Sequence, residues 1–95
     1  MNPPEIAITS AGVGRWNVEV CAGTSTTHVV AIPAGYLAKL GVAAVAPESV
    51  LEASFRFLLE RESNTSILRS FALPVIAQYF PEYEDEIAQR LRDHT

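Results

Sequence analysis

Apolar and polar residues alternate along the first third of the chain, in the pattern typical of β-strands. Trp16, Val18 and Val20 fall on one side of one such stretch, and polar or small residues fall on the other. Successive side chains of a strand point to opposite faces, so this stretch predicts a half-buried strand. Two flanking stretches show a similar pattern, and turn residues separate all three. The sequence therefore predicts a three-stranded antiparallel meander over about residues 5–32.

The rest of the chain shows the spacing of three to four residues that is typical of helices. The strongest pattern covers residues 47–62, where Pro47 stands at the start and an apolar stripe includes Phe55 and Leu58. Phe57 widens this stripe beyond what a helix covered on one side needs. Shorter helices are predicted over residues 33–41, 73–80 and 81–93, and a short helical turn is predicted over residues 66–71.

The predicted strands all precede the predicted helices along the chain, and this order is typical of an α+β domain. We therefore expect one domain of residues 1–95, with a sheet part (5–32) covered on one face by a helical part (33–95) of about four helices. A composition of 48% hydrophobic and 19% charged residues fits a folded, globular chain.

Three local expectations follow from individual residues. Residues 42–46 are apolar and are expected to form a buried connector. Asn64 lies in the break after the long helix and is expected to take the left-handed conformation that often ends a helix. His28 lies inside a predicted strand and is expected to face solvent or a sheet edge.

The charge pattern makes a nucleic-acid partner unlikely. The net charge is −4, and from Pro47 onward nine acidic residues face five arginines that are scattered along the sequence. Such a chain repels phosphate backbones unless its basic residues gather on one face. The single cysteine, Cys21, permits no internal disulfide. Because neither a signal peptide nor a membrane span is recognisable, we expect a cytoplasmic protein with no membrane contact.

The sequence offers no constellation for catalysis or metal binding. Cys21, His28 and His94 lie far apart, whereas a zinc site needs three or four converging ligands. Neighbouring acids in residues 82–86 fan around a predicted helix and are not expected to converge on a cation. We therefore expect no enzyme, no catalytic residue, no cofactor and no metal.

Three aromatic residues surround Pro81 between the last two predicted helices. If they pack inward they fix the angle between these helices, and if they face outward they resemble the aromatic anchors of protein interfaces. Acidic side chains beside them offer a surface to a basic partner. The candidate interaction residues are therefore Trp16, Tyr79, Phe80, Glu82, Tyr83, Glu84 and Asp85.

These observations favour a non-enzymatic protein that acts by contact with another protein or with a second copy of itself as a homodimer. A DNA-binding or antitoxin-like regulator is one alternative. A small-ligand-binding domain, with a pocket between Trp16 and the helices, is another.

The first alternative is based on a resemblance over residues 27–62. A strand, THVVAIP, followed by two helical strings, AGYLAKLG and ESVLEASFRFLLERE, resembles the ribbon–helix–helix pattern. Such domains are dimers whose paired strands enter the major groove, so the resemblance implies DNA binding. The groove-facing positions are apolar here rather than basic, and two further strands precede the ribbon.

A second resemblance covers nearly the whole chain. The strings ASFRFLLERE, SILRSF and LPVIAQYFPEYE are similar to those of a set of small bacterial proteins of unassigned function. These proteins combine a strand meander with the same helical strings. The resemblance implies a fold and a bacterial origin, and it implies no activity.

Overall fold

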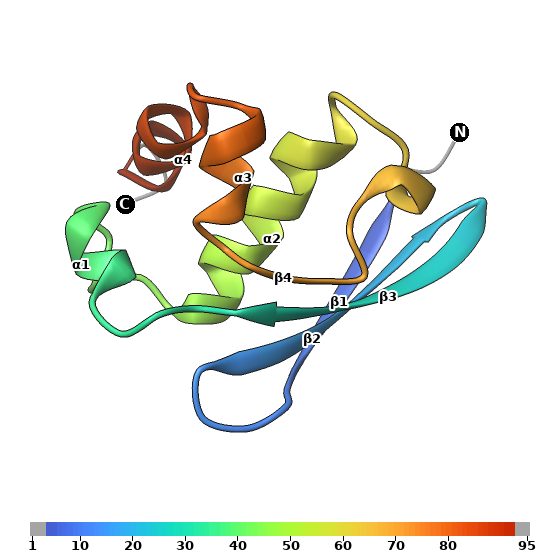
Figure 1. Cartoon of the computed structure of the whole chain (residues 1–95), viewed down its shortest axis with the longest axis horizontal. Helices are drawn as coiled ribbons and strands as arrows, with labels where there is room; N and C mark the ends of the chain where they lie inside the picture. The colour runs from blue at the N-terminus through green and yellow to red at the C-terminus, as the bar shows by residue number, and fades with distance from the viewer. Residues whose placement is uncertain (1–3, 93–95) are drawn as a thin grey trace.

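A mixed four-stranded sheet with helices on one side makes up the computed structural model, which describes residues 4–92 (Figure 1). The first three strands form an antiparallel meander, as the alternating pattern predicts. The strands are β1 (Glu5–Ser10), β2 (Arg15–Ala22), β3 (Thr24–Ala31) and β4 (Ser70–Ala72), and they lie in the order β1-β2-β3-β4. An α+β architecture is therefore confirmed.

The fourth strand, β4, is a correction to the predicted three-stranded meander. It pairs in parallel with β3, so the sheet is mixed, and it occupies part of the helical turn predicted over residues 66–71. The amide of Val29 donates to the carbonyl of Arg69, and the amide of Leu73 donates to the carbonyl of Ala31, both at 2.8 Å. β4 forms because its backbone groups find hydrogen-bond partners along the edge of β3. A segment of three residues is too short to show a periodic pattern, so this pairing leaves no signal in the sequence.

Residues 4–92 also contain four α-helices and one 3-10 helix. Pro47 stands at the first position of the longest helix, as predicted, and this helix ends at Leu59 rather than at the predicted Glu62. Gly41 follows the first helix with a φ of 78°, a left-handed conformation that favours glycine. The helices are α1 (Tyr36–Lys39), α2 (Pro47–Leu59), η1 (Asn64–Ser66), α3 (Val75–Tyr79) and α4 (Tyr83–Arg92).

The longest helix, α2, is buried on two sides because it lies between the sheet and α4 (Figure 1). Toward the sheet, the Phe55 ring lies 5.4 Å from the His28 ring. Toward α4, the Phe57 ring lies 5.3 Å from the Tyr83 ring. Both phenylalanines are fully buried. This two-sided packing explains why the apolar stripe of α2 is wider than a surface helix needs.

Two local expectations about connecting segments are wrong. In residues 42–46 only Val42 is fully buried, and Ala43, Ala44 and Ala46 are exposed. Asn64 does not take a left-handed conformation, because no non-glycine residue within residues 4–92 has a positive φ. It begins η1 instead and its side chain is buried.

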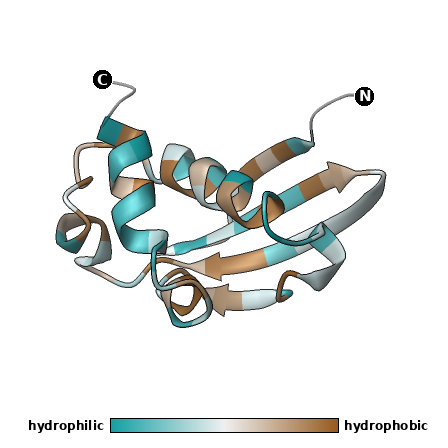
Figure 2. Cartoon of the chain, turned by 90° about the horizontal axis from the view of Figure 1, so that it is seen from above, coloured by the Kyte–Doolittle hydropathy of each residue, from teal (hydrophilic) through white to brown (hydrophobic). Residues whose placement is uncertain are grey.

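Among residues 4–92, no helix covers the second face of the sheet. Side chains of β2 and β3 alternate between buried and exposed positions, as expected when one face is covered and the other is not. Figure 2 shows β3 and β4 as neighbouring arrows that run the same way, with β4 at a border of the sheet. Within residues 4–92, no helix combines the length and apolar character needed to cross a lipid bilayer.

Candidate functional site

An open groove lies where the end of α2, the segment from η1 to β4, and α3 meet. Its volume is about 280 Å³. This is at the lower end for ligand pockets, so it suits a few side chains better than a large cofactor. The side chains around it are mostly apolar. They belong to Leu58, Glu62, Ser66, Ile67, Leu68, Phe71, Val75, Ile76, Tyr79 and Phe80.

The mouth of the groove exposes two large apolar side chains. Leu68 is 47% exposed and Tyr79 is 66% exposed, while Ile67 and Ile76 in the same lining are buried. In the described part of the chain, the other large exposed apolar residues are Val13, in the β1–β2 turn, and Val29, on the open face of the sheet. The groove is therefore the place where exposed and buried apolar side chains form one continuous surface.

Glu62 is the one charged side chain in the groove lining. No hydrogen bond or ion pair joins its carboxylate to any other residue between positions 4 and 92. Glu60, two positions earlier, is by contrast paired with Arg61 and Arg90. The groove therefore has an uncompensated negative charge at its edge.

One wall of the groove is held in place by a buried histidine. His28 Nδ1 lies 2.7 Å from the carbonyl oxygen of Leu68, which is 40 positions away in the sequence. The imidazole is fully buried, so the expectation that His28 faces solvent or an edge is wrong. The reason is the register of β3, in which Thr26, His28 and Val30 all point toward the helices.

The hydrogen bonds around His28 show which ring nitrogen donates to the groove wall. A carbonyl oxygen only accepts, so Nδ1 carries a hydrogen and donates to Leu68. Nε2 forms a hydrogen bond with the Thr26 hydroxyl at 2.9 Å. The Asn64 amide donates to Thr26 Oγ1 at 3.0 Å and to the Thr24 carbonyl at 2.7 Å. No buried side-chain nitrogen or oxygen of the described residues lacks a partner, so this network fixes η1 and the groove wall to β3.

The aromatic residues around Pro81 lie in three different environments. Tyr79 is exposed at the groove mouth, and Phe80 is half-buried in the lining. Tyr83 is fully buried, with its hydroxyl 2.7 Å from Ser54 Oγ. Because Ser54 donates its hydrogen to the Val50 carbonyl, the phenol of Tyr83 is the donor to Ser54. Only two of the three aromatics therefore take part in the groove.

Trp16 lies away from this groove, beside a shallower hollow of about 380 Å³. It is half-buried and faces Ile32, Pro33 and Leu37. All side chains that line this hollow are apolar. It therefore lacks the convergent polar groups that orient a small ligand.

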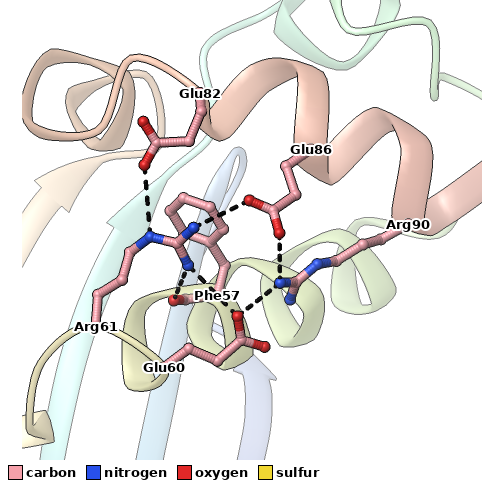
Figure 3. Close-up of polar contacts among 6 residues, drawn as sticks. All are labelled: Phe57, Glu60, Arg61, Glu82, Glu86 and Arg90. Carbon is pink, nitrogen blue, oxygen red and sulfur yellow. Dashed lines mark hydrogen bonds and ion pairs between the residues drawn. The ribbon is translucent and has the colours of Figure 1, made fainter.

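Arg61 joins the end of α2 to the start of α4 (Figure 3). Its guanidinium donates to the Phe57 carbonyl and to Glu86, both at 3.1 Å, and forms an ion pair with Glu82 at 3.5 Å. The guanidinium carbon lies 3.7 Å from the centre of the Phe57 ring, a cation–π distance. Glu82 is thus engaged by an arginine of the same chain.

Arg90 extends this network by bridging two helices (Figure 3). It donates to Glu60 at 2.7 Å and to Glu86 at 2.8 Å. The hydrogen bond from Arg90 lowers the pKa of the Glu60 carboxyl. The pairs are partly exposed to solvent, so their effect on stability is modest, and the network mainly orients α4 against α2.

The remaining acidic candidates do not converge. Glu84 accepts a hydrogen bond from the Tyr36 hydroxyl at 2.7 Å and lies 3.9 Å from Lys39 Nζ. Asp85 is exposed. Within residues 4–92, no group of three His, Cys, Asp or Glu side chains is arranged as a metal site. Cys21 is a free thiol that accepts a hydrogen bond from Ser25 at 3.4 Å, and His94 lies outside the described residues.

Two phenols are tied into the packing of α4, and both have raised pKa values. Burial, and then the hydrogen bond to Glu84, raises the pKa of Tyr36. Burial raises the pKa of Tyr83, and the hydrogen bond with Ser54 opposes this shift in part. Both phenols therefore lose a proton more readily in the unfolded chain than in the folded one.

This difference predicts a loss of stability at high pH. A tyrosine whose pKa is raised by folding contributes its full stabilisation at pH values below its pKa in the unfolded chain, about 10. This contribution is lost as the pH rises above that value toward the pKa in the folded chain. Urea unfolding at a series of pH values should show the decline. Tyr83→Phe should flatten it, at a cost of about 0.5–1.5 kcal/mol near neutral pH for the lost hydrogen bond. Tyr79→Phe, at an exposed ring, is the matched control, and an equal effect of both variants would contradict the prediction.

Eight of the ten residues that line the groove were not among the sequence-based candidates: Leu58, Glu62, Ser66, Ile67, Leu68, Phe71, Val75 and Ile76. They come from three separate segments, and only the tertiary structure brings them together. The nearest available signal was the apolar Leu68, which lies in the segment for which a helical turn is predicted.

The described residues form a small α+β domain with a mixed sheet and an apolar surface groove beside β4. Comparison with protein-family models, with curated proteins and with solved structures gives no match.

Proposed function

We propose that this chain acts without catalysis, by binding a segment of another protein in the groove of Leu68 and Tyr79. The observation that supports this function is the exposure of both side chains at the mouth of a groove with a buried apolar floor. Apolar surfaces of this kind mark interaction sites, and tyrosine is enriched among the residues that dominate binding energy.

Two observations favour this function over DNA binding. The strand that resembles a ribbon is β3. Along Val29–Ala31, β2 pairs with one edge and β4 with the other, so this stretch has no free edge for a second copy. Arginines 61 and 90 are engaged by glutamates rather than collected on an open face. A small-ligand function has weaker support, because the hollow beside Trp16 offers no polar side chain.

The test compares the proteins that the wild type captures from a lysate of its source organism with those that a groove variant captures. We expect the wild type to enrich one or more proteins that a Leu68→Ser, Tyr79→Ser double variant loses by at least about tenfold, since each removed anchor is worth 1 kcal/mol or more. Val13→Ser is the matched control, because Val13 is fully exposed and distant from the groove. It should capture the same proteins as the wild type, as measured by quantitative mass spectrometry.

Two results would contradict the proposal. One is a set of captured proteins that is identical for the wild type and the groove variant. The other is a dimer in light scattering that dissociates when Leu68 and Tyr79 are replaced, because the groove would then hold a second copy of the chain.

A further inference from the structure

The outer edge of β4 has free backbone groups next to the groove. The Arg69 carbonyl and the Leu73 amide form hydrogen bonds with β3. These two residues are four positions apart, so their backbone groups point to the same side of the strand. Backbone groups alternate in direction along a strand, so the amides of Ser70 and Ala72 and the carbonyl of Ser70 point away from β3. No hydrogen bond joins these groups to another residue of the described chain.

The groove lies on the outer side of this strand. Its lining includes Phe71 of β4 but no residue of β3. Phe71 points to the helix side, where its ring is 6.1 Å from that of Phe55. A further strand beside β4 would place every second side chain on this same side, between Leu68 and Tyr79.

We infer that the ligand of this chain is an extended segment of another protein that pairs with β4 as a fifth strand. This inference depends on the proposed function and specifies its ligand. The backbone of the segment bonds to Ser70 and Ala72, and one large apolar side chain enters the groove. This is the β-augmentation mode, in which the main chain supplies affinity and a pocket supplies specificity.

The charge of the groove defines a second feature of the segment. Glu62 has no partner among residues 4–92, and the net charge of the chain is −4. A lysine or arginine next to the apolar side chain compensates Glu62. An acidic segment is repelled.

A second copy of the chain fits the groove poorly. If two β4 strands paired about a two-fold axis, the side chain that each offers on the helix side would be Phe71. That side chain already packs in its own core against Phe55, so it does not reach the groove of the other copy. Both copies would also bring an unpaired Glu62 to the contact.

The experiment selects ligands from a phage-displayed library of random peptides and then measures hydrogen exchange by NMR on the complex with the best peptide. We expect enriched sequences with a large apolar residue beside a lysine or arginine. In the complex, amide exchange of Ser70 and Ala72 should slow by about tenfold or more, as expected for a new hydrogen bond worth about 1.5 kcal/mol.

The outcomes separate this inference from the proposed function. Peptides that need Tyr79 but leave the exchange of Ser70 and Ala72 unchanged would refute strand addition and leave groove binding intact. If the library yields no peptide and the lysate capture is also negative, both fail. Enrichment of acidic peptides would overturn the charge assignment.

A charge variant provides an independent check. Glu62→Lys should weaken binding of the selected basic peptide by up to about fivefold, the range of an exposed ion pair. Glu19→Lys makes the same change in net charge on the open face of the sheet, where Glu19 is exposed, and should leave affinity unchanged. Equal effects of both variants would show that Glu62 has no specific role.

Discussion

Replacing Phe57 with alanine should lower the free energy of unfolding by about 3–5 kcal/mol, the usual cost of deleting a buried phenylalanine. Phe57 belongs to α2 and is fully buried where α2 packs against α4. Its ring makes edge contacts with Phe80 and Tyr83, at 5.9 Å and 5.3 Å between ring centres. The Arg61 guanidinium also covers it, at 3.7 Å from the ring centre. The substitution therefore removes apolar burial and ring contacts together.

Urea unfolding followed by the fluorescence of the single tryptophan, Trp16, measures this loss. Val13→Ala is the control, because Val13 is fully exposed and its truncation should change stability by less than about 0.5 kcal/mol. A loss below about 1 kcal/mol for Phe57→Ala would mean that α4 does not pack on α2 through this ring.

Replacing His28 with alanine should cost about 2–5 kcal/mol, from the cavity left in the core and from two hydrogen bonds that lose a partner. The carbonyl of Leu68 would be left unsatisfied, and the Thr26 hydroxyl would keep only the hydrogen bond that it accepts from Asn64. Because this network holds η1 and the groove wall, the variant should also exchange amide hydrogen faster over residues 64–69 than the wild type does.

Thr27→Val is the matched control for His28→Ala. Thr27 immediately precedes His28 in β3 and points to the exposed face, so this substitution should change stability by less than about 0.5 kcal/mol. If His28→Ala has an equally small effect, or leaves exchange in residues 64–69 unchanged, the histidine does not anchor the groove.

The elements that have strong local patterns could be predicted from the sequence. Period-two alternation in β2 and the proline-initiated stripe of α2 led to the correct element types. Local patterns do not determine where an element ends, which is why α2 ends at Leu59 and not at Glu62. The three-residue strand β4 had no pattern of its own, since its position depends on the edge of β3.

The burial of His28 could have been found from register alone. It shares its parity in β3 with the apolar Val30, which is fully buried. The prediction gave more weight to the polarity of the side chain than to period-two geometry. The structure resolves the conflict with two hydrogen bonds to the ring, which remove the penalty for burying it.

The groove was predictable only in part. Tyr79 and Phe80 were recognised as aromatic residues at a helix junction, but their partners come from the end of α2 and from the segment before β4. Sequence periodicity identifies faces of single elements and contains no information on which faces of separate elements meet. The same limit explains why Trp16, an equally good candidate by composition, lies elsewhere.

The late position of β4 in the chain has a consequence for synthesis on the ribosome. The meander, residues 5–31, emerges first, and the carbonyl that His28 contacts belongs to a residue 40 positions further on. Until that part has been translated, the outer edge of β3 has no neighbour, and a bare strand edge is a template for pairing with other chains. The tendency of the nascent chain to aggregate is thus greatest in this interval, which ends when Ser70–Ala72 emerge and pair with Val29–Ala31.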